Sequence, residues 1–134
     1  MERVYTTPRL DKLGVRPGMR VALVNFDDPV FVAELRERTH DITSGDPLPG
    51  TAIIVYAADS LEALGRLPEL RERLVPDGAI WVVSRKGRQA TIRDVDVIAA
   101  AKAAALVDNK VASFDATRTS LRLVIPLALR PPVR

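Results

Sequence analysis

Leu74-Val75-Pro76-Asp77-Gly78-Ala79-Ile80-Trp81-Val82-Val83-Ser84 is the stretch of this sequence that decides the fold. It begins at the end of an amphipathic helix, continues through the turn-forming Pro76-Asp77-Gly78, and then runs through apolar residues for the length of a strand. A basic segment, Arg85-Lys86-Gly87-Arg88, follows. The stretch therefore predicts a helix and a buried strand of a layered α/β domain, with a charged loop where the strand ends.

Two more apolar runs of strand length lie upstream, at residues 20–25 and 51–57. Neither run alternates with polar residues, which is typical of parallel strands that are covered on both faces. A helix signal follows each run: Asp28-Pro29 can cap and open the first helix, and Asp59 or Ser60 can cap the second. The polar segment at residues 39–50 has room for at most one short edge strand, around residues 41–43.

Downstream of the basic loop, the pattern predicts an alanine-rich helix at residues 94–106 and a pair of strands at 110–114 and 121–127. Strands that alternate with helices favour a parallel sheet. We therefore predict an α/β fold, a three-layer Rossmann-like and mostly parallel sheet with a C-terminal antiparallel hairpin strand. The single predicted domain spans residues 1–134, with its core at about residues 10–128 and tails at 1–7 and 129–134.

The composition excludes several classes of site. There is no cysteine and one histidine, so disulfides, thiolate nucleophiles and cysteine-based metal centres are excluded, and no metal site is predicted. The net charge of +3 is small and acidic residues are interspersed, so a dedicated nucleic-acid partner is not expected. No apolar run approaches the ~18–20 residues that span a bilayer, and residues 1–5 lack a secretory signal. We expect a cytoplasmic protein with no membrane partner.

Three segments resemble class I (Rossmann-like) S-adenosylmethionine (SAM)-dependent methyltransferases. Residues 13–21 (LGVRPGMRV) resemble the entry to their first strand, residues 70–83 (LRERLVPDGAIWVV) their helix-turn-strand element, and residues 103–108 (AAALVD) their closing helix. The chain also resembles a family of short bacterial proteins, a domain of unknown function with a reduced version of this fold. That pattern runs through LGVRPGMRVALVN, LRERLVPDGAIWV and SLRLVI.

The chain departs from the methyltransferase pattern where the cofactor would bind. The resemblance implies a glycine-rich turn after strand one, but Asn25-Phe26-Asp27-Asp28-Pro29 stands there, and we expect Phe26 and Pro29 to obstruct or stiffen the turn. The resemblance also implies a ribose-binding acidic residue after strand two, for which Asp41 and Asp46 are poor candidates. We therefore expect no cofactor, no catalytic residue, and a non-catalytic methyltransferase-like domain that acts in binding, interaction or regulation.

The alternative is a divergent SAM-dependent methyltransferase. In that case SAM would be the cofactor, held in an unusual pose near Asn25, Asp27, Tyr56 and Asp59. The partner of a non-catalytic domain stays open, and a homo-oligomer is one of the alternatives.

The basic loop is the other candidate site. Arg85, Lys86 and Arg88 follow a strand that ends at the ligand-binding edge of such sheets, and the next helix is predicted to start near Thr91. These four residues could bind a small anionic ligand or, weakly, a nucleic acid through residues 85–91. The alternative is a solvated loop whose cations pair with Asp94 and Asp96, and Thr91 with Asp94 has the spacing of a capping box.

Overall fold

The structure, a computed structural model, describes residues 8–131. Within this range six strands form one sheet in the order β2-β1-β3-β4-β6-β5. The strands β2, β1, β3 and β4 are parallel, and β6 pairs antiparallel with both β4 and β5. The bounds are β1 (Val21–Val24), β2 (Ile42–Ser44), β3 (Thr51–Ala57), β4 (Leu74–Arg85), β5 (Val107–Ser113) and β6 (Arg118–Val124).

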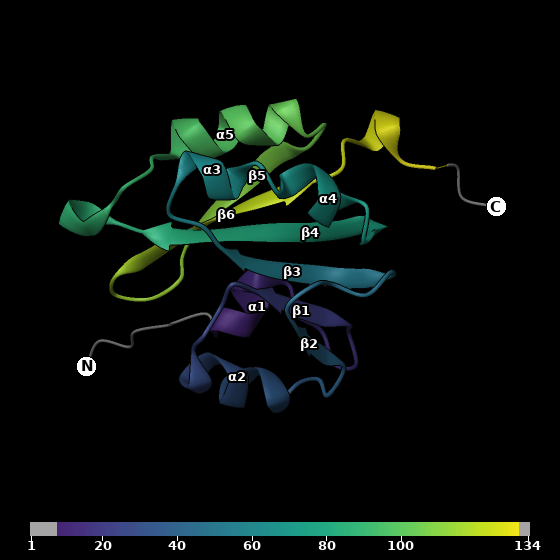
Figure 1. Cartoon of the computed structure of the whole chain (residues 1–134). Helices are drawn as coiled ribbons and strands as arrows, with labels where there is room; N and C mark the ends of the chain where they lie inside the picture. Colours follow the sequence, from purple (N-terminus) through teal and green to yellow (C-terminus); the bar gives the residue numbers. More distant parts are fainter. Residues whose placement is uncertain (1–7, 132–134) are drawn as a thin grey trace, which may run out of the picture.

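Helices cover both faces of the sheet (Figure 1). On one face lie α1 (Arg9–Leu13) and α2 (Pro29–Arg36), and on the other α3 (Leu61–Leu64), α4 (Leu67–Arg71) and α5 (Asp94–Ala103). Two short 3-10 turns, Gly87–Gln89 and Leu127–Leu129, complete the elements. The predicted three-layer α/β architecture, with a mostly parallel sheet and an antiparallel C-terminal hairpin, is confirmed.

The central strand β4 contributes to the core on both faces. Ile80 and Val82 pack under α3, α4 and α5, while Ala79, Trp81 and Val83 face α1 and α2. Trp81 is fully buried, and its Nε1 donates a hydrogen bond of 2.9 Å to the backbone oxygen of Leu13. The indole therefore joins the middle of the sheet to the end of α1.

Side-chain caps begin two of the helices, as predicted. The carboxylate of Asp28 accepts a 3.0 Å hydrogen bond from the backbone N–H of Phe31, and Pro29 is the first residue of α2. The hydroxyl of Ser60 accepts a 3.0 Å bond from the N–H of Ala63 at the start of α3. Each cap satisfies one of the free N–H groups of a first helical turn.

Pro76-Asp77-Gly78 was predicted to be a turn before the strand, and this is wrong. These residues lie inside β4, where the pairing with β3 shifts its register. A Cβ atom at Gly78 would lie 2.8 Å from the backbone oxygen of Ala52, so only glycine fits this close approach between the strands. The turn-forming residues therefore mark an irregularity within the strand.

Other boundaries differ by a few residues. The helix predicted at residues 94–106 ends at Ala103, and Ala105 has a φ of 58° just before β5. The strand β5 begins at Val107, three residues before its predicted start, and carries an irregularity between Asp108 and Lys110.

The predicted tails fall partly outside the described residues, which exclude 1–7 and 132–134. In the remainder of the second tail, Leu129 lies in a 3-10 turn and the Nε of Arg130 donates to the backbone oxygen of Ile125 at 2.9 Å. No helix among residues 8–131 is long and apolar enough to cross a membrane.

Replacing Trp81 by Phe tests the link between sheet and α1. The Trp81→Phe variant leaves the backbone oxygen of Leu13 without its donor and opens space in the core. We expect the free energy of unfolding to fall by about 2–4 kcal/mol, measured by urea unfolding followed by circular dichroism. The control is Leu127→Ala, at a side chain that is 79% exposed, with an expected change within about 0.5 kcal/mol. Equal stabilities of the two variants would contradict the assignment.

Candidate ligand site at the carboxyl edge of the sheet

An open hollow lies at the carboxyl ends of β1, β2 and β3. Its volume is about 520 Å³, within the range of about 300–1,000 Å³ typical of small-molecule sites. The parallel strands end together at this edge, which is where open α/β sheets bind ligands. The lining residues come from the ends of these strands and from the segment that includes α3: Val24, Asn25, Gly45, Tyr56, Ser60, Glu62, Ala63 and Arg66.

The turn after β1 takes a conformation that usually requires glycine. Asn25 has a φ of 54°, in the left-handed region that asparagine tolerates better than most residues, and its Nδ2 donates to the backbone oxygen of Ala57 at 3.0 Å. The side chain of Phe26 lies against Phe31 and Phe114, with ring centroids 5.4 Å from each. Neither Phe26 nor Pro29 is among the residues that line the hollow, and whether they stiffen the turn stays a prediction.

Three of the side chains that line the hollow, those of Tyr56, Glu62 and Arg66, are polar and can ionise. The hydroxyl of Tyr56 donates a 2.5 Å hydrogen bond to the backbone oxygen of Ala63, and burial is the main cause that raises the pKa of Tyr56. Arg66 donates hydrogen bonds to Glu69 at 2.6 Å and to Asp46 at 3.0 Å, and the bond that Glu69 accepts is the main cause that raises the pKa of Arg66. The carboxylate of Glu62 has no hydrogen-bond or ion-pair partner among residues 8–131 and lines the hollow.

The structure brings together two of the four predicted cofactor residues. Asn25 and Tyr56 both line the hollow, whereas Asp27 and Asp59 do not. Asp27 is exposed in the turn between β1 and α2. Asp59 is occupied elsewhere, since its Oδ1 accepts the backbone N–H of Arg85 at 2.9 Å.

Six lining residues were not predicted from the sequence: Val24, Gly45, Ser60, Glu62, Ala63 and Arg66. Ser60, Glu62 and Ala63 had a signal, because the first turn of a helix that follows a parallel strand lies beside the ligand-binding edge and Ser60 caps that helix. Arg66 lies beyond the end of α3 and had no such signal. Gly45 gave a weaker signal, because the position of the short strand β2 before it was open.

The predicted anion-binding residues of the basic loop lie near one another but mostly bind groups of this chain. The Nζ of Lys86 donates to the hydroxyl of Ser113 at 2.9 Å, and the hydroxyl of Thr91 donates to the backbone oxygen of Asp59. The Nε of Arg85 lies 3.9 Å from a carboxylate oxygen of Asp59. Arg88 has no hydrogen-bond or ion-pair partner in the described part of the chain. An anion at this loop stays a prediction.

The start of α5 differs from its prediction. The helix begins at Asp94, and the carboxylate of Asp96 accepts the backbone N–H of Arg93 at 2.8 Å. The predicted capping box of Thr91 and Asp94 is therefore wrong, as is the pairing of the loop cations with Asp94 and Asp96, because Asp59 takes that place.

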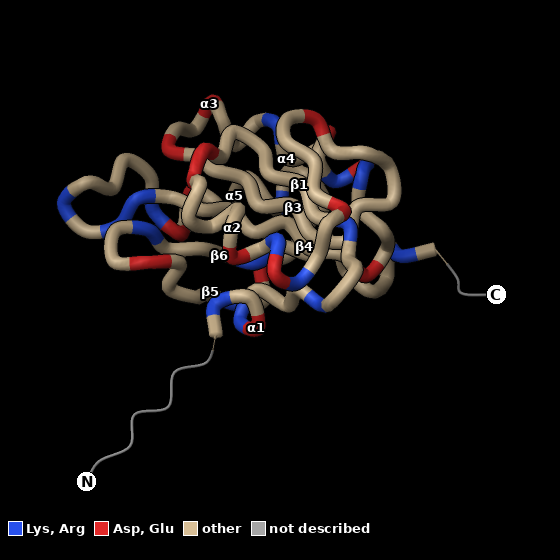
Figure 2. Tube along the Cα trace, turned by 90° about the horizontal axis from the view of Figure 1, so that it is seen from below, with Lys and Arg blue, Asp and Glu red and all other residues tan. Residues whose placement is uncertain are grey.

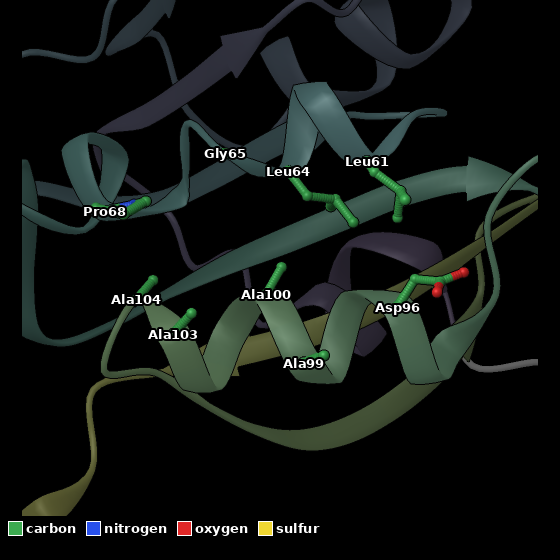
Figure 3. Close-up of a pocket in the computed structure, with 9 residues that line it drawn as sticks. All are labelled: Leu61, Leu64, Gly65, Pro68, Asp96, Ala99, Ala100, Ala103 and Ala104. Atoms are coloured by element: carbon green, nitrogen blue, oxygen red, sulfur yellow. The ribbon is translucent and has the colours of Figure 1, made fainter.

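A second hollow, of about 390 Å³, lies between the α3–α4 segment and α5. Figure 3 shows Leu61 and Leu64 pointing toward α5 and its alanines. Asp96 is its single carboxylate, and this side chain already accepts the N–H of Arg93. The apolar lining offers no group for chemistry.

Basic and acidic residues alternate along much of the described chain. Figure 2 shows lysine and arginine segments interspersed with acidic ones along the trace. Among residues 8–131, no group of three or more histidine, aspartate or glutamate side chains is placed to hold a metal ion.

Arg118 ties the turn after β1 to the C-terminal hairpin. Its Nη2 lies 2.5 Å from a carboxylate oxygen of Asp28 and 2.5 Å from one of Asp115, and its guanidinium stacks over Phe26 and Phe114. Burial by itself raises the pKa of Asp28 and Asp115, but the hydrogen bonds and charge of Arg118, with backbone N–H donors, outweigh it and lower both pKa values below 3.8.

The Arg118→Gln variant tests this network through its pH dependence. A lowered carboxyl pKa stabilises the folded protein above the ordinary value of 3.8, and that contribution is lost as the pH falls through the lowered pKa. We expect the variant to lose roughly 1.5–3 kcal/mol of stability at pH 7, and the difference from the unchanged protein to shrink below pH 4.

Urea unfolding at pH 7 and pH 3 measures this difference. The control is Arg16→Gln, at an exposed position, with no pH-dependent difference expected. A stability difference for Arg118→Gln of the same size at both pH values would contradict an electrostatic role.

Comparison with solved structures identifies the fold. An SAM-dependent methyltransferase from Aquifex aeolicus is 13% identical and superposes with a TM-score of 0.69 over 87% of each chain. Magnesium protoporphyrin IX methyltransferase from Synechocystis PCC 6803, with SAM bound, is 11% identical, with a TM-score of 0.65 over 87% of this chain and 74% of that one. A TehB-like SAM-dependent methyltransferase from Corynebacterium glutamicum is 13% identical, with a TM-score of 0.55 over 88% and 86%.

No family model matches the sequence, and no curated protein matches it either. The structural similarities nevertheless establish that this is a divergent domain with the class I methyltransferase fold. They also correct the prediction that the chain takes no cofactor. The similar structures are those of SAM-dependent enzymes, one with SAM bound, and they point to SAM as the candidate cofactor.

The residues of the hollow fit such a cofactor. Asn25 has a left-handed backbone, the ring of Phe26 packs against Phe31 and Phe114, and neither Phe26 nor Pro29 lines the hollow. The carboxylate of Glu62, which has no hydrogen-bond or ion-pair partner among residues 8–131, can accept hydrogen bonds from hydroxyl groups of a ligand. Val24 and Ala63 offer apolar surface.

Proposed function

We propose that this protein binds SAM in the hollow at the carboxyl ends of β1 and β3 and acts as a divergent SAM-dependent methyltransferase. The observation that carries the proposal is the hollow at the end of β1, where Asn25 has a left-handed backbone and Glu62, whose carboxylate has no partner among residues 8–131, lines the same hollow. The similarity of the fold to SAM-dependent methyltransferases supports the same reading.

We assign different roles in ligand binding to different lining residues. Glu62 would accept hydrogen bonds from hydroxyl groups, and its negative charge favours a cationic ligand. Arg66, fixed by Asp46 and Glu69, would form a rigid wall on the side of α3. Bound SAM supplies a methyl group on a positively charged sulfur.

Isothermal titration calorimetry with SAM and with S-adenosylhomocysteine tests binding. We expect dissociation constants in the range of about 1 µM to 1 mM. The Glu62→Gln variant should weaken binding about tenfold or more, because a hydrogen bond to a charged group is worth about 1.5–3 kcal/mol.

The matched control for this titration is Glu37→Gln, at an exposed carboxylate at the end of α2. It should leave the affinity unchanged. An absence of heat with both ligands, or equal losses in the two variants, would overturn the proposal.

Turnover separates an enzyme from the binding or regulatory role that the sequence first suggested. The measurement is the formation of S-adenosylhomocysteine from SAM when the protein is incubated with nucleophilic small molecules such as catechols, amines and thiols. Binding of SAM without turnover across these acceptors would favour a regulatory domain that holds SAM as a ligand.

A further inference from the structure

A third hollow, of about 260 Å³, lies on the opposite face of the sheet from the candidate SAM site. It is formed where the end of α1 approaches the strands of the C-terminal hairpin. Three of its lining residues are cations and one is an amide. The lining residues are Asp11, Lys12, Gly14, Asn109, Lys110 and Arg122.

Two of the cations are direct neighbours across the hairpin. Lys110 on β5 and Arg122 on β6 are register partners of the antiparallel pair. Like charges in this relation destabilise a sheet. The Nζ of Lys110 donates to the backbone oxygen of Lys12 at 3.0 Å, which brings a third positively charged residue to the same place without adding a carboxylate.

Arg122 lies on β6, between β4 and β5. It is partly buried, pairs in register with Trp81 on its other side, and has no hydrogen-bond or ion-pair partner among residues 8–131. Burial, and then the charge of Arg130, lower the pKa of Arg122. A guanidinium that is partly withdrawn from water and lacks an acceptor loses part of its hydration, which a bound anion would replace.

The one carboxylate of the lining, that of Asp11, forms an ion pair with Arg38, which does not line the hollow. Asp11 lies 2.5 Å from the Nη1 of Arg38, which also donates to the backbone oxygen of Val15. Lys12, Lys110 and Arg122 therefore share a hollow whose acidic residue is paired outside the set. The amide of Asn109 adds a neutral hydrogen-bond donor.

We propose that this hollow binds the phosphate group of a ligand, with Arg122 as its central donor and Lys12 and Lys110 beside it. A guanidinium offers a phosphate two parallel hydrogen bonds, and the flanking ammonium groups match the charge of a dianion. The dianion would also relieve the repulsion between Lys110 and Arg122. The site is independent of the proposed SAM hollow, which lies on the other face.

Calorimetry with inorganic phosphate and with glycerol 3-phosphate, at constant ionic strength in sodium chloride, tests the proposal. Both probes should bind, and Arg122→Gln should weaken binding at least tenfold. The matched control is Arg36→Gln, an exposed arginine on α2, which should leave the affinity unchanged. Tighter binding of glycerol 3-phosphate would show that the group belongs to a larger ligand, and equal binding would indicate the free ion.

Thermal unfolding of the Lys110→Gln variant gives a second readout that does not depend on Arg122→Gln folding. Without phosphate, its Tm should change little, because the variant loses both the repulsion from Arg122 and the hydrogen bond from the Lys110 Nζ to the backbone oxygen of Lys12. The rise in Tm that phosphate produces in the unchanged protein should be absent from the variant. Failure of both probes to bind, or equal losses of affinity in Arg122→Gln and Arg36→Gln, would overturn the proposal.

Discussion

The ion pairs of Arg118 join the start of α2 to the turn of the C-terminal hairpin, beside the carboxyl end of β1. One guanidinium bridges Asp28, at the start of α2, and Asp115, in the turn of the hairpin, and it covers the rings of Phe26 and Phe114. Because Asp28 also caps α2, the same contact fixes the direction in which the chain leaves β1. The left-handed turn at Asn25 and the opening beside it depend on that direction.

The layers of the fold could be predicted because the buried strands have a local sequence signal, a continuous apolar run. The apolar runs that became β1, β3 and the buried part of β4 need cover on both faces, and the caps Asp28 and Ser60 mark the helices that supply it. Gly78 was misread because a glycine that permits two backbones to approach has the same local signature as a glycine in a turn. Only the neighbouring strand distinguishes the two cases.

The candidate site was harder to predict, because it depends on where side chains turn. Phe26 in the sequence suggests obstruction, yet its ring packs between α2 and the hairpin, against a partner almost ninety positions away. Glu62 has no motif around it, and it is notable because it lines the hollow and its carboxylate has no partner within the described part of the chain. Arg122 likewise becomes notable only through its register with Lys110. Which residues line these sites depends on contacts between segments that are distant in the sequence.

The irregularity in β5 affects how these molecules behave in a crowded solution. An edge strand with free N–H and C=O groups invites pairing with another chain, and β5 also exposes Val107 and Val111. Its break between Asp108 and Lys110 interrupts the regular row of hydrogen-bonding groups, and Lys110 places a charge there. At the opposite edge, β2 is only three residues long. Both margins therefore discourage edge-to-edge growth of the sheet into aggregates.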